Sequence, residues 1–190
     1  MKEIIKKLIQ FWRHFRFRKK AIIHPTAIIH PTAKFFNPQG KRENISIGAF
    51  SNVRGELLLY GHGGGISIGE YCYIGEDTRI WSSGSIQIGN RVLIAHNVNI
   101  HDSNSHPLDS KERHEHFLEI ISNGHPKQLF LNEKDVVIQD DVWIGFNSSV
   151  LKGVTIGSNS IIAACSTVIK DVDSNTVVSG NPATILKKSK

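Results

Sequence analysis

Histidine is concentrated in one stretch of this 190-residue chain. Six of the ten histidines fall between His96 and His125, and the densest part is HDSNSHPLDSKERHEHF, from His101 to Phe117. Histidine is the side chain best suited to moving a proton near neutral pH, and its ring nitrogens are also common metal ligands. The stretch therefore indicates either general acid–base chemistry or metal binding.

A regular pattern of apolar residues surrounds that stretch and must position it. From Ile138 onward, an apolar residue returns at every sixth position: Ile138, Ile144, Val150, Ile156, Ile162 and Val168. The same interval occurs earlier, at Ile23 and Ile29, at Ile47 and Val53, at Ile68, Ile74 and Ile80, and at Ile88, Ile94 and Ile100. An α-helix repeats its apolar face about every 3.6 residues and a half-buried strand about every second residue, so neither element explains the pattern.

An interval of six is typical of a parallel β-helix, in which stacked coils of three short flat steps share one core. The position four after each apolar residue is small or β-branched, as a tight corner beside the core requires: Val142, Ser148, Val154, Ser160 and Ser166. Gly145 and Gly157 directly follow an apolar residue, and glycine suits a turn because it reaches positive φ without steric cost. We therefore predict a mainly β solenoid.

The interruptions of the pattern divide the chain. A loop longer than about 15 residues is uncommon inside a domain and often carries function, so the histidine-rich insertion is the expected site of chemistry. The predicted parts are a helical leader (1–20), early coils (21 to about 100, interrupted near 36–44 and at GHGGG, 61–65), a loop-like insertion (about 101–135), late coils (136 to about 178) and a basic tail. After the leader, residues 21–190 form one predicted domain.

The positive charge of the chain lies in the leader. Residues 1–20 hold eight Lys or Arg and one acidic residue, so the remainder has a net charge of only −1 out of the total of +6. Ile4, Ile5, Leu8, Phe11, Trp12 and Phe15 fall near one face of the predicted helix. Such a helix either lies on an anionic membrane surface or packs against the solenoid end or a neighbouring subunit.

Nucleic-acid binding is not expected, because no nucleic-acid motif accompanies the basic stretch. The sequence also shows neither a membrane-spanning apolar stretch nor a signal-peptide pattern.

The insertion and the late coils resemble one known family. SHPLDSKER (105–113) looks like the HPLD segment of the maltose and galactoside acetyltransferases, and residues 142–172 and 177–188 look like that family's late coils and tail. The sequence HDSNSHPLD is closer still to bacterial surface-polysaccharide O-acetyltransferases. The resemblance covers about residues 45–188. It implies a left-handed β-helix, a homotrimer, and metal-free transfer of acetyl from acetyl-CoA to a hydroxyl of a sugar or glycan precursor. The two cysteines lack metal-binding spacing and are typical of buried residues in a reducing cytoplasm, so we expect the protein there, at the inner face of the membrane if the leader binds lipid.

In that family the first histidine of the segment is the catalytic base, which corresponds to His106. A sugar hydroxyl attacks a thioester poorly until its proton is removed, and a positioned imidazole contributes about 10²–10⁴-fold. Asp102, Asp109 or a backbone carbonyl could orient the ring. His101 is the competing candidate for the base, and a surface histidine without function is the other alternative for His106.

Relatives hold acetyl-CoA in a groove between neighbouring solenoids of a trimer. The matching positions in this chain are Phe146, Ala164, Ile169, Lys170, Thr184 and Lys187. Lys187 stands where relatives have an arginine, so it would meet a phosphate without bidentate geometry. The alternative for the end of the chain is a solvated basic tail.

The sugar-binding positions depart from the family. An Asn and an Asp that hold the sugar in galactoside enzymes correspond to Gly75 and Ser83, so neither galactoside nor maltose specificity is predicted. Trp81, which could stack on a pyranose face, and Asp102 are the other candidate contacts to the acceptor. Each is alternatively an ordinary coil residue.

Two other functions compete with acetyl transfer. His96 and His101, with His62 as the only early candidate for a third ligand, could form a zinc site like that of gamma-class carbonic anhydrases, which need three protein ligands. The other competitor is a solenoid that only scaffolds a complex. The histidine-rich insertion has no purpose in a scaffold, and the HPLD segment has none in the zinc enzyme.

Overall fold

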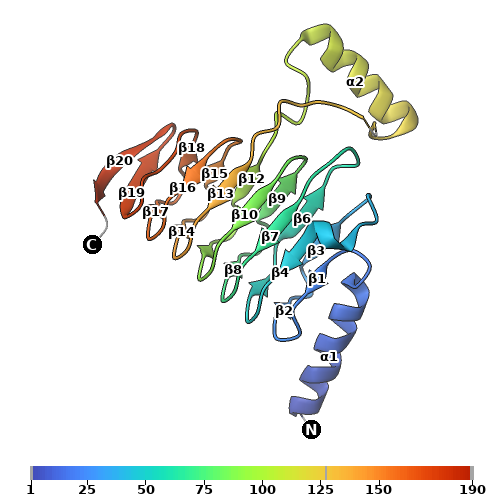
Figure 1. Cartoon of the computed structure of the whole chain (residues 1–190), viewed down its shortest axis with the longest axis vertical. Helices are drawn as coiled ribbons and strands as arrows, with labels where there is room; N and C mark the ends of the chain where they lie inside the picture. The colour runs from blue at the N-terminus through green and yellow to red at the C-terminus, as the bar shows by residue number, and fades with distance from the viewer. Residues whose placement is uncertain (1, 127, 189–190) are drawn as a thin grey trace.

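The computed structural model describes residues 2–126 and 128–188, and it shows a long stack of short strands with a helix at one end and a second helix projecting beside it (Figure 1). The strands form three sheets whose strand order follows the coils. All strand pairings are parallel except that of the last two strands, which form a hairpin. The predicted left-handed parallel β-helix is confirmed.

The first sheet, sheet A, contains β1 (Ile22–Ile23), β4 (Ile45–Ile47), β7 (Ile66–Ile68), β10 (Ile86–Ile88), β13 (Val136–Ile138) and β16 (Thr155–Ile156). Sheet B contains β2 (Ile28–Ile29), β5 (Asn52–Val53), β8 (Tyr73–Ile74), β11 (Leu93–Ile94), β14 (Trp143–Ile144), β17 (Ile161–Ile162), β19 (Thr176–Gly180) and β20 (Ala183–Lys188). Sheet C contains β3 (Lys34–Phe36), β6 (Glu56–Leu59), β9 (Arg79–Ser82), β12 (Asn99–His101), β15 (Ser149–Val150) and β18 (Thr167–Val168).

The residues spaced six apart form the core. Ile94 and Ile144 are in register on neighbouring coils, and both are fully buried. The small residues of the second restricted position lie at the corners, where Ser148 and Ser160 donate hydrogen bonds from their hydroxyls to the carbonyls of Ala163 (3.0 Å) and Asp173 (2.8 Å). A buried hydroxyl is tolerated there because it meets a carbonyl of the next coil.

The reason for glycine at Gly145 and Gly157 differs from the prediction. Neither is among the described residues with positive φ; at other corners, residues such as Asn97 and Asn147 adopt that conformation, which asparagine tolerates well. A Cβ at Gly145 would lie 2.5 Å from the backbone nitrogen of Ala164. Glycine is required there by the close approach of the next coil.

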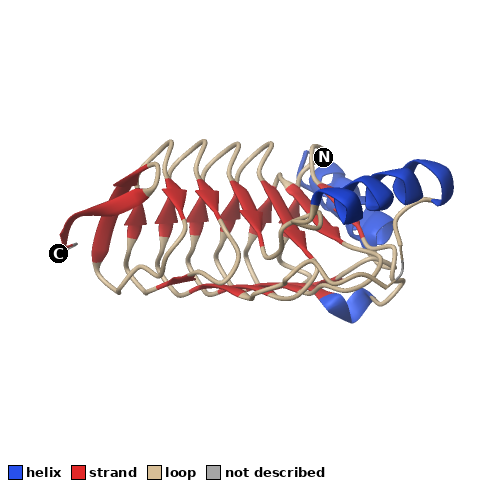
Figure 2. Cartoon of the chain, turned by 90° about the horizontal axis from the view of Figure 1, so that it is seen from above, coloured by secondary structure: helices blue, strands red, loops and turns tan. Residues whose placement is uncertain are grey.

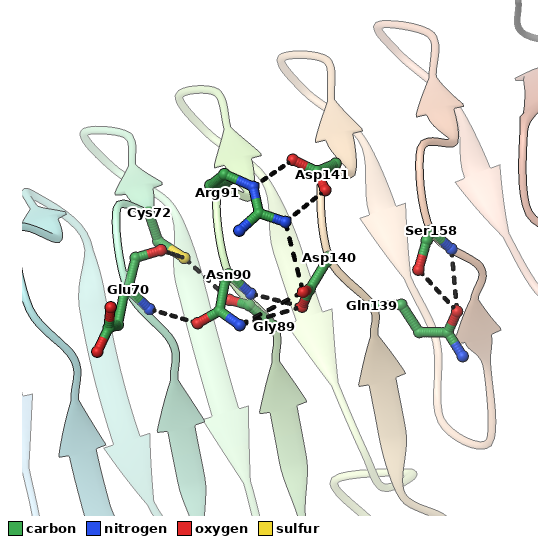
Figure 3. Close-up of polar contacts among 9 residues, drawn as sticks. All are labelled: Glu70, Cys72, Gly89, Asn90, Arg91, Gln139, Asp140, Asp141 and Ser158. Carbon is green, nitrogen blue, oxygen red and sulfur yellow. Dashed lines mark hydrogen bonds and ion pairs between the residues drawn. The ribbon is translucent and has the colours of Figure 1, made fainter.

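The insertion leaves the stack of coils undisturbed. Ile88 of β10 pairs with Ile138 of β13, across fifty residues of sequence. At the same corner the backbone N–H of Asn90 donates to Asp140 (2.8 Å), and Arg91 forms two hydrogen bonds of 2.7 Å with Asp141 (Figure 3). The coils before and after the insertion therefore stack as direct neighbours.

Two parts of the chain are more ordered than predicted. The insertion contains a helix, α2 (Ser110–Asn123), whose N-terminus is capped by Asp109, with Gly124 at its C-terminus. The basic tail forms β20, which pairs with β19 and is exposed to solvent from Thr184 to Lys188.

The leader forms α1 (Lys2–Phe17), and a short 3₁₀ helix (Arg42–Asn44) lies in the first predicted interruption. Both α-helices lie toward the end of the solenoid where the chain begins, whereas the other end consists of strands (Figure 2). Within the described residues, no helix is long and apolar enough to cross a membrane.

Candidate functional site

Two backbone hydrogen bonds close the neck of the insertion. Lys134 N–H donates to the carbonyl of Asp102 (2.9 Å), and Asn104 N–H donates to the carbonyl of Leu131 (3.1 Å). The insertion therefore begins and ends at fixed points directly beside sheet C.

The insertion brings two histidines together. Nδ1 of His106 lies 3.2 Å from Nδ1 of His116, which projects from α2. His116 is buried, whereas His106 is exposed. Hydrogen bonding between the two Nδ1 atoms requires that one carry the proton and the other accept it.

Burial favours the neutral form of His116. Its pKa is lowered from the usual value, chiefly by desolvation and then by the neighbouring His106. Its Nε2 atom is buried and lacks a hydrogen-bond partner among the described residues. A neutral His116 can accept a hydrogen bond from Nδ1–H of His106 at its own Nδ1 only if the ring proton of His116 is on Nε2.

The pair borders a cleft of about 1190 Å³ between the insertion and sheet C. Its floor includes Phe36, Leu58 and Trp81, which are in register on β3, β6 and β9 and point outward from the solenoid. The insertion supplies the opposite wall, with Ser105, His106, His116, Ile120 and Leu131. At the end near α1, the cleft reaches Lys20 and Lys41.

His62, in the GHGGG interruption, also lines the cleft. Gly64 has a φ of +119°, and a Cβ there would collide with the carbonyl oxygen of Ser82 on the next coil. This close approach holds the turn that carries His62. Nε2 of His62 lies 3.7 Å from a carboxylate oxygen of Glu133, and burial lowers the pKa of the ring although Glu133 opposes the shift.

Sequence reasoning missed His116 as a partner of His106, and it considered His62 only as a metal ligand. A weak signal for His116 was present, because Asp109 and Gly124 bracket a possible helix that would carry it. The sequence contains no corresponding signal for the contact of His62 with Glu133.

The predicted acceptor contacts divide into one that lines the cleft and two that are buried. Trp81 lines the cleft, and its indole N–H donates to Glu56 (2.9 Å). Asp102 is fully buried, and it accepts hydrogen bonds from the Ser82 hydroxyl (2.6 Å), Ser83 N–H (2.8 Å) and Gly84 N–H (3.0 Å). Ser83 is also buried. We therefore assign Ser83 and Asp102 to the support of the neck and leave them out of the acceptor site.

The two aspartates expected to orient His106 are engaged elsewhere. Asp102 holds the turn after β9, and Asp109 accepts hydrogen bonds from the backbone N–H groups of Lys111 (2.9 Å) and Glu112 (3.0 Å). These backbone donors lower the pKa of the Asp109 carboxyl. The side chain that contacts the His106 ring is His116 of α2, and neither of the two aspartates suggested by the sequence does so.

His101, the competing base, lies outside the described lining of the cleft. Its ring is 5.1 Å from that of Trp81, and burial lowers its pKa. His96 instead stacks on Phe146, with ring centroids 5.3 Å apart. No group of three or more His, Cys, Asp or Glu in residues 2–126 and 128–188 is arranged to hold a metal ion.

The predicted cofactor positions lie along two edges of the late coils. Phe146 and Ala164 are on neighbouring coils at one corner, where Cys165 N–H donates to the carbonyl of Phe146 (2.8 Å), and Thr184 and Lys187 are on the hairpin strand β20. Ile169 and Lys170 follow β18 and are exposed at another corner. None of these six is among the described residues that line the cleft.

Comparisons with known proteins identify the repeat. Residues 135–170 match the family model described as bacterial transferase hexapeptide (six repeats). A putative acetyltransferase of Saccharomyces cerevisiae, YJL218W, is 37% identical over 67% of this chain, although this chain spans only 58% of the length of that relative. The galactoside O-acetyltransferase of Escherichia coli K12 is 30% identical over 78% of this chain and 68% of the relative.

The chain belongs to the hexapeptide-repeat transferase family. A solved structure is also similar in three dimensions: the polySia specific acetyltransferase NeuO has 27% sequence identity and a TM-score of 0.60, and the match covers 85% of this chain and 71% of that protein. The family resemblance seen in the sequence is thus confirmed.

Proposed function

We propose that this hexapeptide transferase moves acetyl from acetyl-CoA to a hydroxyl of a sugar or glycan. The observation that carries the proposal is the His106–His116 pair beside the cleft. A general base needs an accessible nitrogen whose lone pair is free, and a neighbouring group that fixes its tautomer. His106 is exposed, and His116 is the neighbouring group.

The pair assigns a role to each nitrogen. Nδ1–H of His106 donates to Nδ1 of neutral His116, which leaves Nε2 of His106 free to take the proton of the acceptor hydroxyl. The hydroxyl oxygen attacks the thioester carbonyl, the carbon–sulfur bond breaks, and His106 returns the proton to the CoA sulfur. The products are an acetyl ester and CoA.

The donor would lie along the late coils in a homotrimer. The six cofactor positions follow two edges of one solenoid, so a groove between neighbouring copies would bring them to one ligand. Sheet B carries exposed apolar residues suited to such contacts, because Tyr73, Leu93 and Trp143 are in register and point outward. An exposed apolar ladder of this kind is typical of an interface.

The acceptor would lie in the cleft. Its volume exceeds that of a usual small-molecule site, about 300–1,000 Å³, which favours a glycan over a single free sugar. Trp81 offers an aromatic face, and the buried nitrogens of His62 and His116 offer polar contacts. One relative is named for galactoside and one solved structure is named for polySia, which supports a saccharide acceptor. We place the reaction in surface polysaccharide biosynthesis as part of the same proposal.

Turnover of acetyl-CoA in the presence of different sugar classes tests the proposal. His106→Ala should lower kcat by about 10²–10⁴-fold, because the base is lost, while the fold and acetyl-CoA binding persist. His114→Ala is the matched control, since His114 is exposed on α2 and is not part of the cleft lining. Near-normal turnover by His106→Ala, or no transfer to any sugar by the wild type, would contradict the proposal.

A further inference from the structure

Helix α1 carries an uncovered apolar face. Exposed fractions reach 62% for Phe11 and 63% for Trp12, and Ile5, Leu8, Ile9 and Phe15 are also exposed. The side chain of Ile4, predicted on the same face, lies outside the described residues. Within one chain, the predicted packing of this face against the solenoid end does not occur.

The helix is attached to the solenoid through its opposite side. Phe17 is buried, and its ring lies 4.3 Å from that of Phe35, measured between centroids. Phe17 follows Phe15 by two residues, which is about 200° around an α-helix. The attachment through Phe17 therefore turns the apolar face away from the solenoid.

The attachment is reinforced just after the helix. Ala21 is buried, and Lys20 donates a hydrogen bond from Nζ to the carbonyl of Phe35 (2.8 Å). These contacts fix the base of α1 beside the first coils, with the apolar face pointing outward.

We propose that α1 docks on an anionic lipid surface. Residues 1–20 combine eight basic residues and one acidic residue with the exposed aromatic face. Such a helix binds by burying its apolar face among the acyl chains, while its basic residues attract anionic headgroups. The inference does not depend on the proposed acetyl transfer.

Charge favours lipid over a second copy of this chain. Residues 21–190 have a net charge of −1, so a neighbouring copy as a whole offers the leader almost no net negative charge. An anionic membrane provides both an apolar layer and negative charge. Lys20 belongs both to the base of the helix and to the end of the cleft, so docking would bring that end of the cleft near the lipid surface.

Vesicle flotation of the full chain tests the proposal. The wild type should float with vesicles of phosphatidylcholine and phosphatidylglycerol, and binding should weaken as salt is raised, because charge attraction is screened. The double substitution Phe11→Ser and Trp12→Ser should reduce binding by about tenfold or more, because the two most exposed aromatic residues of the anchor are removed. Phe117→Ser is the matched control, since Phe117 is a half-exposed aromatic on the other helix.

Three results would overturn the inference. They are equal flotation with phosphatidylcholine alone, an unchanged affinity of the double variant, and an equal loss in the Phe117→Ser control. A double variant that changes oligomeric state, in a protein that does not bind the anionic vesicles, would show that α1 contacts a second copy instead. Circular dichroism of each variant checks that the solenoid is intact.

Discussion

Proton placement between His106 and His116 determines which nitrogen of His106 is free. The two Nδ1 atoms are 3.2 Å apart, and burial lowers the pKa of His116 and so favours its neutral form. If His116 is the acceptor, Nε2 of His106 is left without a proton. His116 is therefore a positioning residue, acting on the acceptor through His106.

Substitutions of His116 separate its positioning role from its packing role. His116→Leu should lower kcat by about a hundredfold with little change in KM, because loss of the group that fixes a catalytic imidazole costs up to about 10⁴-fold in a serine protease. His116→Asn should retain most activity, since its amide oxygen can take the place of Nδ1. Equal activity of the two variants would show that His116 acts only through packing.

The lowered pKa of His116 also has a consequence for stability. Well above the ordinary histidine pKa of about 6.5, neither the folded nor the unfolded chain protonates this ring. As the pH falls below that value, the unfolded chain takes up a proton that the buried ring resists, so the free energy of unfolding falls as the pH falls. Urea unfolding across this range should show a shallower pH dependence for His116→Asn than for the wild type. An unchanged slope would contradict the shift.

At the scale of elements, Asp102 connects β12 to the turn that follows β9. Its fully buried carboxylate accepts two backbone N–H groups and the Ser82 hydroxyl, and its carbonyl closes the neck of the insertion. Asp102→Ala removes the acceptor of the buried Ser83 N–H and of the Gly84 N–H, although the Ser82 hydroxyl can still donate to the carbonyl of Gly65 (3.0 Å). This loss should lower the free energy of unfolding by about 3 kcal/mol. Urea unfolding measures this change. If the Asp102→Ala variant instead had an unchanged free energy of unfolding but no longer bound the sugar acceptor, Asp102 would be a residue of the acceptor site.

The coils were predictable because their signal is local. Each residue spaced six apart, such as Ile144, faces the core whatever lies elsewhere in the chain. α2 was missed because its apolar pattern is weak, although Asp109 and Gly124 could have marked its ends. The contact between His106 and His116 depends on that helix, and the position of His62 depends on the stacking of Gly64 against Ser82. Such contacts between distant segments are set by the fold and leave no spacing in the sequence.

At the scale of the whole molecule, the proposed trimer and the proposed membrane contact reinforce each other. Rotation about a threefold axis keeps every copy at the same height, so the three α1 helices would lie at one end of the assembly. Three linked contacts bind a surface far more tightly than one, often by 10²–10⁴-fold. Even if a single α1 helix binds the lipid surface weakly, three of them in one trimer would thus hold the protein on the membrane.

Trp143→Glu tests this coupling. Trp143 is half exposed on sheet B, in register with Leu93, so a charge there should disrupt the apolar ladder between copies. Sedimentation should show a fall in mass from trimer to monomer, and binding to phosphatidylglycerol vesicles should weaken by about tenfold or more although α1 is unchanged. Gln87→Glu places the same charge on sheet A of the neighbouring coil, where Gln87 pairs with Val137, and should keep both properties. If the monomer bound vesicles as tightly as the wild type, a single α1 would be sufficient for docking and the coupling would be absent.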